Sequence, residues 1–159
     1  MNASQLIERL QLLPHPEGGY YKEMYRSALK IAAHGGAERN VSTTIYYLLE
    51  NDNKSHFHRI KSDEFWFFHQ GNPIEILVID NGHINSIILG NDIENGELPQ
   101  AMVPAGMWFA AHIQSESGFA LTSCTVAPGF DFADFELADR NVLLNECPGS
   151  KDVVGRFIR

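Results

Sequence analysis

The chain has 159 residues, 44% of them hydrophobic, which is enough for one compact domain that buries about two-thirds of its unfolded surface. Twelve basic residues stand against twenty acidic ones, and the resulting formal charge of -8 repels nucleic-acid phosphates and anionic membrane surfaces. Nucleic acid and membranes are therefore not expected as partners, and we expect residues 1–159 to form a single domain.

The first predicted element is a short helix at about residues 3–13. Leu6, Ile7, Leu10 and Leu13 fall on one helical face, and the prolines that follow cannot continue a helix. The motif "PHPEGGY" comes next, in which His15 is interpreted as part of a turn and the glycines as residues that permit a tight turn. This opening segment is predicted to dock on whatever follows it.

A β-rich barrel is predicted at about residues 19–137. Short runs such as "VSTTIYYLLE", "DEFWFFHQ" and "GMWFAAHI" are rich in β-branched and aromatic residues, and clusters of turn residues separate them. Asn81-Gly82 lies between "PIEILVID" and "HINSIILG", which predicts a hairpin with a two-residue primed turn. Residues 138–159 form a C-terminal segment with a short helical piece, so the fold class is all-β with a few short helices, of jelly-roll or small-barrel type.

Two cysteines, Cys124 and Cys147, are too few for a disulfide framework and lack zinc-knuckle spacing. They are predicted to be free thiols in a reducing compartment. Glu8 and Arg9 interrupt the apolar N-terminal stretch, which therefore resembles neither a secretory signal nor a membrane span. A cytoplasmic protein is expected.

The stretch "SHFHRIKSDEFWFFHQG" carries the first candidate site. Because residues two apart on a strand share a face, His56 and His58 are predicted to project into one cavity, and Glu64 can join them from the next strand. Two imidazoles and one carboxylate make a site for a divalent transition metal such as Fe(II), Mn(II), Ni(II) or Zn(II). The identity of the metal stays open at this point.

The same parity argument brings aromatic rings to the site. Glu64, Trp66 and Phe68 lie at even offsets, so if the carboxylate faces the barrel interior, both rings do so too. A carboxylate beside two rings suits a sugar or a similar polar, partly apolar molecule. The alternative is that the rings only fill the barrel core.

These motifs resemble a known family. His56-x-His58 followed by Glu64-x6-Gly71 resembles the first motif of the cupin superfamily, and Pro104-x-Gly106 resembles the start of the second. The blocks "LLPHPEGGYYKEMYRS", "FHRIKSDEFWFF", "VPAGMW" and "VAPGFDFADFEL" are similar to the uncharacterised cupin superfamily-5 group, formerly a domain of unknown function. The resemblance implies an RmlC-like cupin jelly-roll barrel, a double-stranded β-helix, commonly a homodimer, with a pocket in the barrel and no established reaction.

The chain departs from the general cupin pattern at several positions. Five residues separate His58 from Glu64, where three or four are usual, and Phe109 stands where the second motif would supply a histidine ligand. His112 does not replace that ligand, since an offset of three residues puts it on the opposite strand face from Phe109. A pocket with Phe109 is more apolar and chelates a metal more weakly.

Chemistry without a metal is the other interpretation of this pocket, as in the sugar-nucleotide epimerases with cupin barrels. There a histidine removes a proton next to a carbonyl and a tyrosine supplies one, so His58 and Glu64 become candidate catalytic residues. The carboxylate that orients His58 stays open between Glu64, Asp131 and Asp134. The candidate ligand-binding residues are Trp66, Phe68, Phe109 and Tyr21, although other tyrosines also remain candidates for the proton donor.

The few cations near this stretch, Arg26, Arg59 and Lys61, make a thin cradle for a diphosphate. A neutral or weakly charged ligand is therefore expected. Three functions remain open: an isomerase or epimerase acting on a carbohydrate-like molecule through His58 and Glu64, a metal-dependent enzyme of the dioxygenase type using His56, His58 and Glu64, and a non-catalytic ligand-binding or sensor module.

Overall fold

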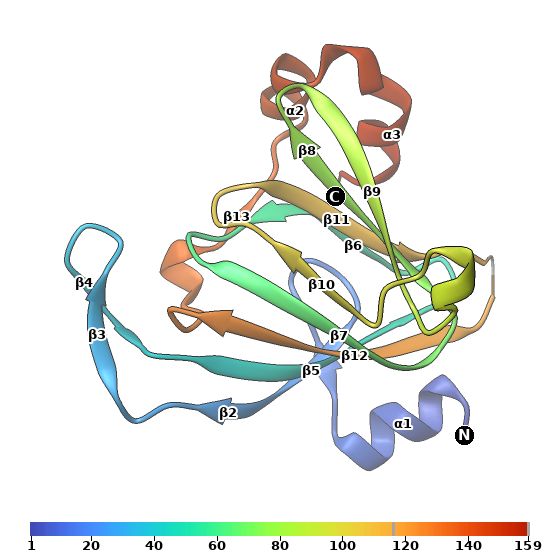
Figure 1. Ribbon diagram of the computed structural model, residues 1–159, viewed down its shortest axis with the longest axis horizontal. Coiled ribbons are helices and arrows are strands. Elements are labelled where there is room, and N and C mark those ends of the chain that lie inside the picture. Colours follow the sequence, from blue (N-terminus) through green and yellow to red (C-terminus); the bar gives the residue numbers. More distant parts are fainter. Residues whose placement is uncertain (116, 159) are drawn as a thin grey trace.

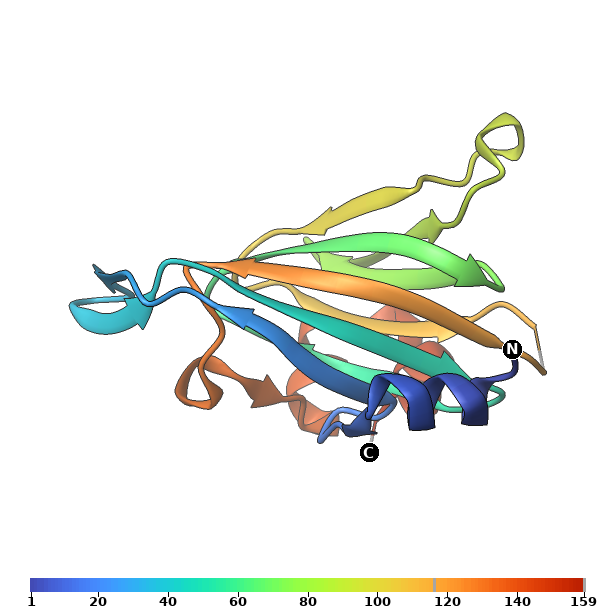
Figure 2. The same ribbon diagram turned by 90° about the horizontal axis from the view of Figure 1, so that it is seen from below.

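A computed structural model describes residues 1–115 and 117–158, which form two large antiparallel sheets and a separate two-stranded one (Figures 1 and 2). The six-stranded sheet has the order β1-β2-β5-β12-β7-β10, and its strands are Leu13–Pro14, Tyr20–Arg26, Thr43–Glu50, Phe119–Ala127, Asp63–Gly71 and Gln100–Val103. The five-stranded sheet has the order β13-β6-β11-β8-β9, and its strands are Glu136–Leu137, Lys54–Arg59, Trp108–Ile113, Ile74–Asp80 and His83–Leu89. Neighbours in each sheet are often distant in sequence, as a jelly roll requires, and the all-β prediction is confirmed.

The remaining elements lie around the two sheets. A hairpin of β3 (Lys30–Ala33) and β4 (Ala37–Asn40) projects to the left in Figure 1. Helices α2 (Arg140–Glu146) and α3 (Lys151–Arg156) gather at the top of the same view, beside β8 and β9. Three short 3-10 turns complete the described chain: η1 (Ile93–Asn95), η2 (Phe132–Asp134) and η3 (Pro148–Ser150).

The core has an inner and an outer part. The inner cluster lies between the sheets and includes Trp66, Phe109 and Tyr47, each about 1% exposed. An outer cluster packs α2 and α3 onto the five-stranded sheet through Phe57, Trp108 and other apolar residues. The C-terminal helices therefore cover the outside of the barrel and leave its interior to the residues of the strands.

The N-terminal helix, α1, spans Ala3–Leu10 and is shorter than predicted. Asn2 and Gln5 form a capping box at its start, and Gln11 adopts a left-handed conformation that ends it. Residues Leu13–Pro14 then pair with β2 as the short strand β1. Among the described residues, no helix is long and apolar enough to cross a membrane.

The predicted hairpin at Asn81-Gly82 is present between β8 and β9. Asp80 pairs with His83, and the two turn residues have φ values of 49° and 79°. Both values are positive, as the primed turn requires.

Strand β6 contains a bulge that matters for the site. Phe109 on β11 pairs with His58, but Ala111 pairs with Ser55, so two residues of β6 stand opposite the single residue Ala110. The extra residue interrupts the two-residue alternation of side chains. As a result, Ser55 and His58 face the barrel interior while Phe57 packs in the outer cluster.

Candidate functional site

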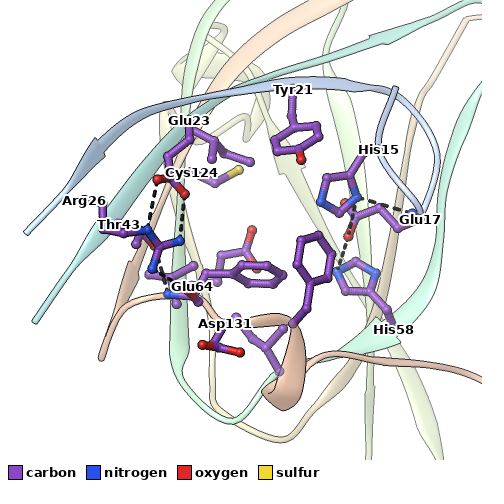
Figure 3. Close-up of a pocket in the computed structure, with 15 residues that line it drawn as sticks. His15, Glu17, Tyr21, Glu23, Arg26, Thr43, His58, Glu64, Cys124 and Asp131 are labelled. Carbon is purple, nitrogen blue, oxygen red and sulfur yellow. Dashed lines mark hydrogen bonds and ion pairs between the residues drawn. The ribbon is translucent and has the colours of Figure 1, made fainter. Parts of the chain in front are cut away.

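A cavity of about 300 Å³ opens at one end of the barrel, between β2, β5, β6, β7, β12 and the segment that follows β12 (Figure 3). Apolar rings and ionisable groups share its wall. The lining residues are His15, Glu17, Tyr21, Glu23, Arg26, Thr43, Ile45, His58, Ile60, Glu64, Cys124, Val126, Phe130, Asp131 and Phe132.

A buried ion pair forms one side of the cavity. Oε2 of Glu17 lies 3.0 Å from Nε2 of His58, and the Ser55 hydroxyl donates a hydrogen bond of 3.0 Å to Oε1 of Glu17. The Glu17 side chain is 9% exposed and that of His58 2%. No motif in the sequence points to Glu17 as the carboxylate that orients His58, a role for which Glu64, Asp131 and Asp134 were the candidates.

The hydrogen bonds of His58 define its protonation. Nδ1 lies 2.8 Å from the carbonyl oxygen of His56, and Nε2 faces the Glu17 carboxylate, so both ring nitrogens meet acceptors and both carry a proton. Burial alone would lower the pKa of His58, but the negative charge of Glu17 raises it above its usual value. Burial would likewise raise the pKa of Glu17, but the positive charge of His58 lowers it to about 2.

Two glycines place Glu17 in this position. Gly18 and Gly19 have φ values of +112° and +74°, which glycine adopts readily. A Cβ on Gly18 would collide with the backbone carbonyl of Lys54, and the Tyr47 hydroxyl donates a 2.7 Å hydrogen bond to the carbonyl of Gly18. The tight turn expected for "PEGGY" therefore presses the loop against β5 and β6.

The bulge of β6 also binds this loop. The carbonyl oxygen of Glu17 lies 2.8 Å from the backbone N–H of His56, which donates to it, and 2.7 Å from Nδ1 of the same histidine. The His56 side chain thus bonds to backbone outside the cavity wall.

Glu64 is the second buried carboxyl group of the cavity. It is 8% exposed, and no N–H or O–H group of the described residues donates to it; its hydrogen-bonding neighbour is the thiol of Cys124. Burial and the negative charge of Glu17 raise the pKa of Glu64 to about 7, against the opposing effect of His58. Burial and the nearby Glu64 raise the pKa of the Cys124 thiol well above its usual range, so this cysteine is not a thiolate.

The rim of the cavity combines charge and aromatic rings. Arg26 is occupied by protein groups, because its guanidinium pairs with Glu23 at 2.7 Å and donates to the carbonyl oxygen of Phe130 at 3.0 Å. Phe132 is 53% exposed and stacks over His15 with ring centroids 6.4 Å apart. Arg26, one of the three cations of the thin cradle expected from the sequence, is thus already paired with an acidic residue.

The candidate ligand-binding residues divide into two groups. Tyr21 lines the cavity. Trp66 and Phe109 are buried in the inner core, and Phe68 packs against that core, so these three rings fill the barrel. Phe109 also packs against His58, with ring centroids 4.1 Å apart.

The residues predicted as metal ligands do not meet as expected. The bulge breaks the alternation that would have put His56 and His58 on one face, and only His58 and Glu64 line the cavity. Both ring nitrogens of His58 are hydrogen-bonded. Within residues 1–115 and 117–158, no group of three or more His, Cys, Asp or Glu side chains has the arrangement of a metal site, so the donor set does not fit a divalent ion.

The two other carboxylates proposed to orient His58 have different partners. Asp134 forms a two-pronged ion pair with Arg39, at 2.6 and 2.9 Å, and lies 3.5 Å from Lys61. Asp131 lines the cavity but accepts a hydrogen bond from the backbone N–H of Ala133, which caps the short turn η2.

Comparison with known proteins identifies relatives of this chain. The chain is 37% identical over 145 residues to an uncharacterised protein of Saccharomyces cerevisiae, YML079W, a match that covers 82% of this chain and 72% of the yeast protein. A solved structure of a hypothetical protein from Leishmania major has a TM-score of 0.92 and 37% identity, with 99% of both chains covered. Protein SO0799 from Shewanella oneidensis has a TM-score of 0.90 and 39% identity, with 100% of this chain and 98% of that chain covered.

More distant structures share only the fold. Oxalate decarboxylase from Bacillus subtilis has a TM-score of 0.55 and 14% identity, and the match covers 91% of this chain and 36% of that enzyme. The family model described as "Cupin superfamily (DUF985)" matches residues 4–138, which include all the residues that line the cavity. The chain therefore belongs to this uncharacterised family of the cupin superfamily and has its double-stranded β-helix fold.

Proposed function

We propose that the protein binds a small, polar, carbohydrate-like molecule in the barrel cavity and moves a proton on it, as isomerases and epimerases do. The observation that carries this proposal is Glu64, a carboxyl group that faces a cavity of about 300 Å³ with a pKa of about 7. A cavity of this volume is at the lower end of the range for small-molecule sites and suits a ligand the size of a monosaccharide.

The pKa of Glu64 suits acid–base catalysis at neutral pH. A group that transfers protons works best when its pKa lies near the working pH, because both of its forms are then populated. The Glu64 carboxylate removes a proton from a carbon next to a carbonyl group, and the electron pair of that bond moves to the carbonyl oxygen. In an isomerase the neutral acid returns the proton to the adjacent carbon, while the hydroxyl proton of that carbon moves to the former carbonyl oxygen. In an epimerase a second group must protonate the original carbon from the opposite face, and Tyr21, which lines the cavity, is the candidate for that donor.

Glu64 is better suited than His58 to act as the base. A base needs a free electron pair, and both ring nitrogens of His58 carry protons that are hydrogen-bonded. The Glu64 carboxyl group accepts no N–H or O–H donor from the described residues. In this proposal the buried positive charge of His58 offsets the negative charges that Glu17 and the developing enolate bring to the cavity.

The charges of the cavity favour a ligand without phosphate. Glu17, Glu23, Glu64 and Asp131 all line it, whereas the guanidinium of Arg26 is already paired with Glu23. A diphosphate would bring further negative charge without a free arginine to bind it. The exposed ring of Phe132 at the rim offers an apolar face of the kind that packs against a sugar.

Deuterium exchange tests the proposal. The protein is incubated in D₂O with unphosphorylated aldoses and ketoses of four to six carbons, and NMR follows the proton on the carbon next to the carbonyl. We expect exchange by the wild type, loss of exchange in Glu64→Gln, and unchanged exchange in Glu94→Gln, which alters an exposed carboxylate on η1. Exchange that survives Glu64→Gln would contradict the role of Glu64.

The same experiment separates the other functions. A sugar that binds the wild type but is recovered without deuterium after long incubation would favour a binding or sensor module. The homodimer and the cytoplasmic location expected from the sequence stay predictions; light scattering on purified protein measures the first, and imaging of the tagged protein in its own cells measures the second.

A further inference from the structure

His15 is a buried polar group that the proposed proton transfer does not use. It lies in the loop between β1 and β2, is 9% exposed and lines the cavity. Tyr21 contacts its ring edge-on at a centroid distance of 4.6 Å, and Phe132 stacks on it at 6.4 Å. These neighbours hold the imidazole in one orientation.

The hydrogen bonds of the loop define the tautomer of His15. The backbone N–H of Glu17 donates to Nδ1 of His15 at 3.3 Å, and Oε2 of Glu17 lies 3.5 Å from the same nitrogen without forming a hydrogen bond. Nδ1 therefore presents its lone pair to the backbone N–H, and the proton of the neutral ring is on Nε2. Burial lowers the pKa of His15, and the positive charge of His58 adds to this effect while Glu17 opposes it. The ring is therefore neutral at pH 7 and has one N–H group.

This N–H group has no partner in the described part of the chain. Nδ1 is engaged by Glu17, and no oxygen of residues 1–115 or 117–158 accepts a hydrogen bond from Nε2. Figure 3 shows the ring on the cavity wall, with the edge opposite Glu17 turned toward the interior. The His15 ring lines the cavity, so a ligand oxygen in the cavity can accept this hydrogen bond.

We propose that the Nε2–H of His15 binds the carbonyl oxygen of the ligand and stabilises the enolate that forms on it. That the oxygen is a carbonyl oxygen rests on the proposed function; the unpaired donor does not. As Glu64 removes the neighbouring proton, negative charge grows on this oxygen, and a fixed donor stabilises the enolate more than the ground state. His15 and Glu64 come from different elements, the β1–β2 loop and β7, and approach the ligand as separate groups.

A matched pair of ligands tests this proposal. L-erythrulose is a four-carbon ketose that cannot close a five- or six-membered ring, and erythritol is one of the two alcohols obtained by reducing its carbonyl group. Binding of each is measured by NMR titration. The hydroxyl oxygens of erythritol can also accept a hydrogen bond from Nε2, but erythritol has no carbonyl group and cannot form an enolate, so it serves as the non-reacting control.

Three variants distinguish the hydrogen bond from packing. His15→Phe keeps a ring and removes the donor, so its affinity for erythrulose is expected to fall about tenfold, the factor that corresponds to one neutral hydrogen bond, and its deuterium exchange is expected to slow by at least as much. His15→Gln places an amide N–H near the position of Nε2 and is expected to recover most of the affinity for erythrulose and most of the exchange. His69→Gln, at an exposed position on β7, is the control and should bind as the wild type does.

Several outcomes would overturn the proposal. Unchanged erythrulose affinity and unchanged deuterium exchange in His15→Phe would refute the role of His15 and leave the proposed function intact. Erythrulose binding that depends on His15 without any deuterium exchange would refute the proposed function and leave the role of His15 in binding intact. A wild type that does not bind erythrulose, or ¹⁵N ring shifts that place the His15 proton on Nδ1, would also refute it.

Discussion

Glu64→Gln offers a direct measurement of the buried carboxyl group. In the unfolded chain Glu64 titrates near its ordinary pKa of 4.5, whereas in the folded protein burial and the charge of Glu17 raise that pKa to about 7. Between these two pH values the unfolded chain loses a proton that the folded protein keeps. The ionisation of Glu64 therefore lowers the free energy of unfolding as the pH rises from 4.5 to 7, and the loss is complete above 7.

The size of the effect follows from the two pKa values. One pKa unit corresponds to about 1.4 kcal/mol, so the rise from 4.5 to about 7 corresponds to about 3 kcal/mol. Glutamine has nearly the same shape and does not ionise. We therefore expect Glu64→Gln to gain about 3 kcal/mol of stability relative to the wild type between about pH 4.5 and about pH 8, or roughly 6–12 °C in melting temperature.

Urea denaturation at several pH values in this range measures the difference directly. Glu17 and His58 are present in both proteins, so to a first approximation their own pH dependence cancels when the two curves are subtracted. Glu94→Gln, at an exposed carboxylate, should run parallel to the wild type. A difference between wild type and Glu64→Gln that stays constant with pH would mean that Glu64 titrates normally and would remove the main support for acid–base chemistry here.

Three further predictions concern the ion pair, the glycine loop and metal binding. Glu17→Gln should lower the free energy of unfolding by about 3 kcal/mol at pH 7, because folding lowers the pKa of Glu17 from 4.5 to about 2. This stabilisation is fully present above pH 4.5 and is lost as the pH falls toward 2. Urea titrations that give equal losses at pH 7 and at about pH 3 would contradict the prediction. Gly18→Ala should lower the melting temperature more than Gly35→Ala. Both glycines have positive φ, which costs an alanine roughly 1–2 kcal/mol, but of the two only Gly18 lies against a backbone carbonyl. Equal losses of melting temperature would show that the contact with this carbonyl does not limit the substitution. Mn(II), Fe(II) or Zn(II) should leave the melting temperature unchanged, because the described donors do not form a metal site, and a rise with metal concentration would refute that conclusion.

The strand pattern predicted much of the fold because it depends on local chemistry. The alternation of apolar side chains and the Asn81-Gly82 turn follow from residues close together in sequence, and both appear as expected. The parity of Glu64 and Trp66 was also correct to the extent that both face the barrel interior. Whether an inward ring lines a cavity or fills the core depends on the opposite sheet, which a single strand does not specify.

The site itself depends on contacts between distant segments. Glu17 and Ser55 are 38 residues apart in sequence, and no spacing in the motif around Glu17 predicts their hydrogen bond. The pair of glycines after it predicted a turn, but not the element against which the turn packs. The sequence did not predict that the His56 side chain bonds to the Glu17 carbonyl and not to the cavity, because a rule of strict alternation does not detect one extra residue in β6.

In a regular strand the main chain of every residue takes part in pairing with the neighbouring strands. In β6 the extra residue frees main-chain groups to bind residues of the cavity. Because His56 is released from the ladder with β11, its main chain serves the cavity: its N–H holds the Glu17 loop, and its carbonyl accepts the proton on Nδ1 of His58. Deleting His56 would leave Ser55, Phe57 and His58 on the faces they already occupy, in an uninterrupted strand. Such a shortened chain would keep its barrel and lose the main-chain anchors of the ion pair, so that integrity of the fold and integrity of the cavity could be measured apart.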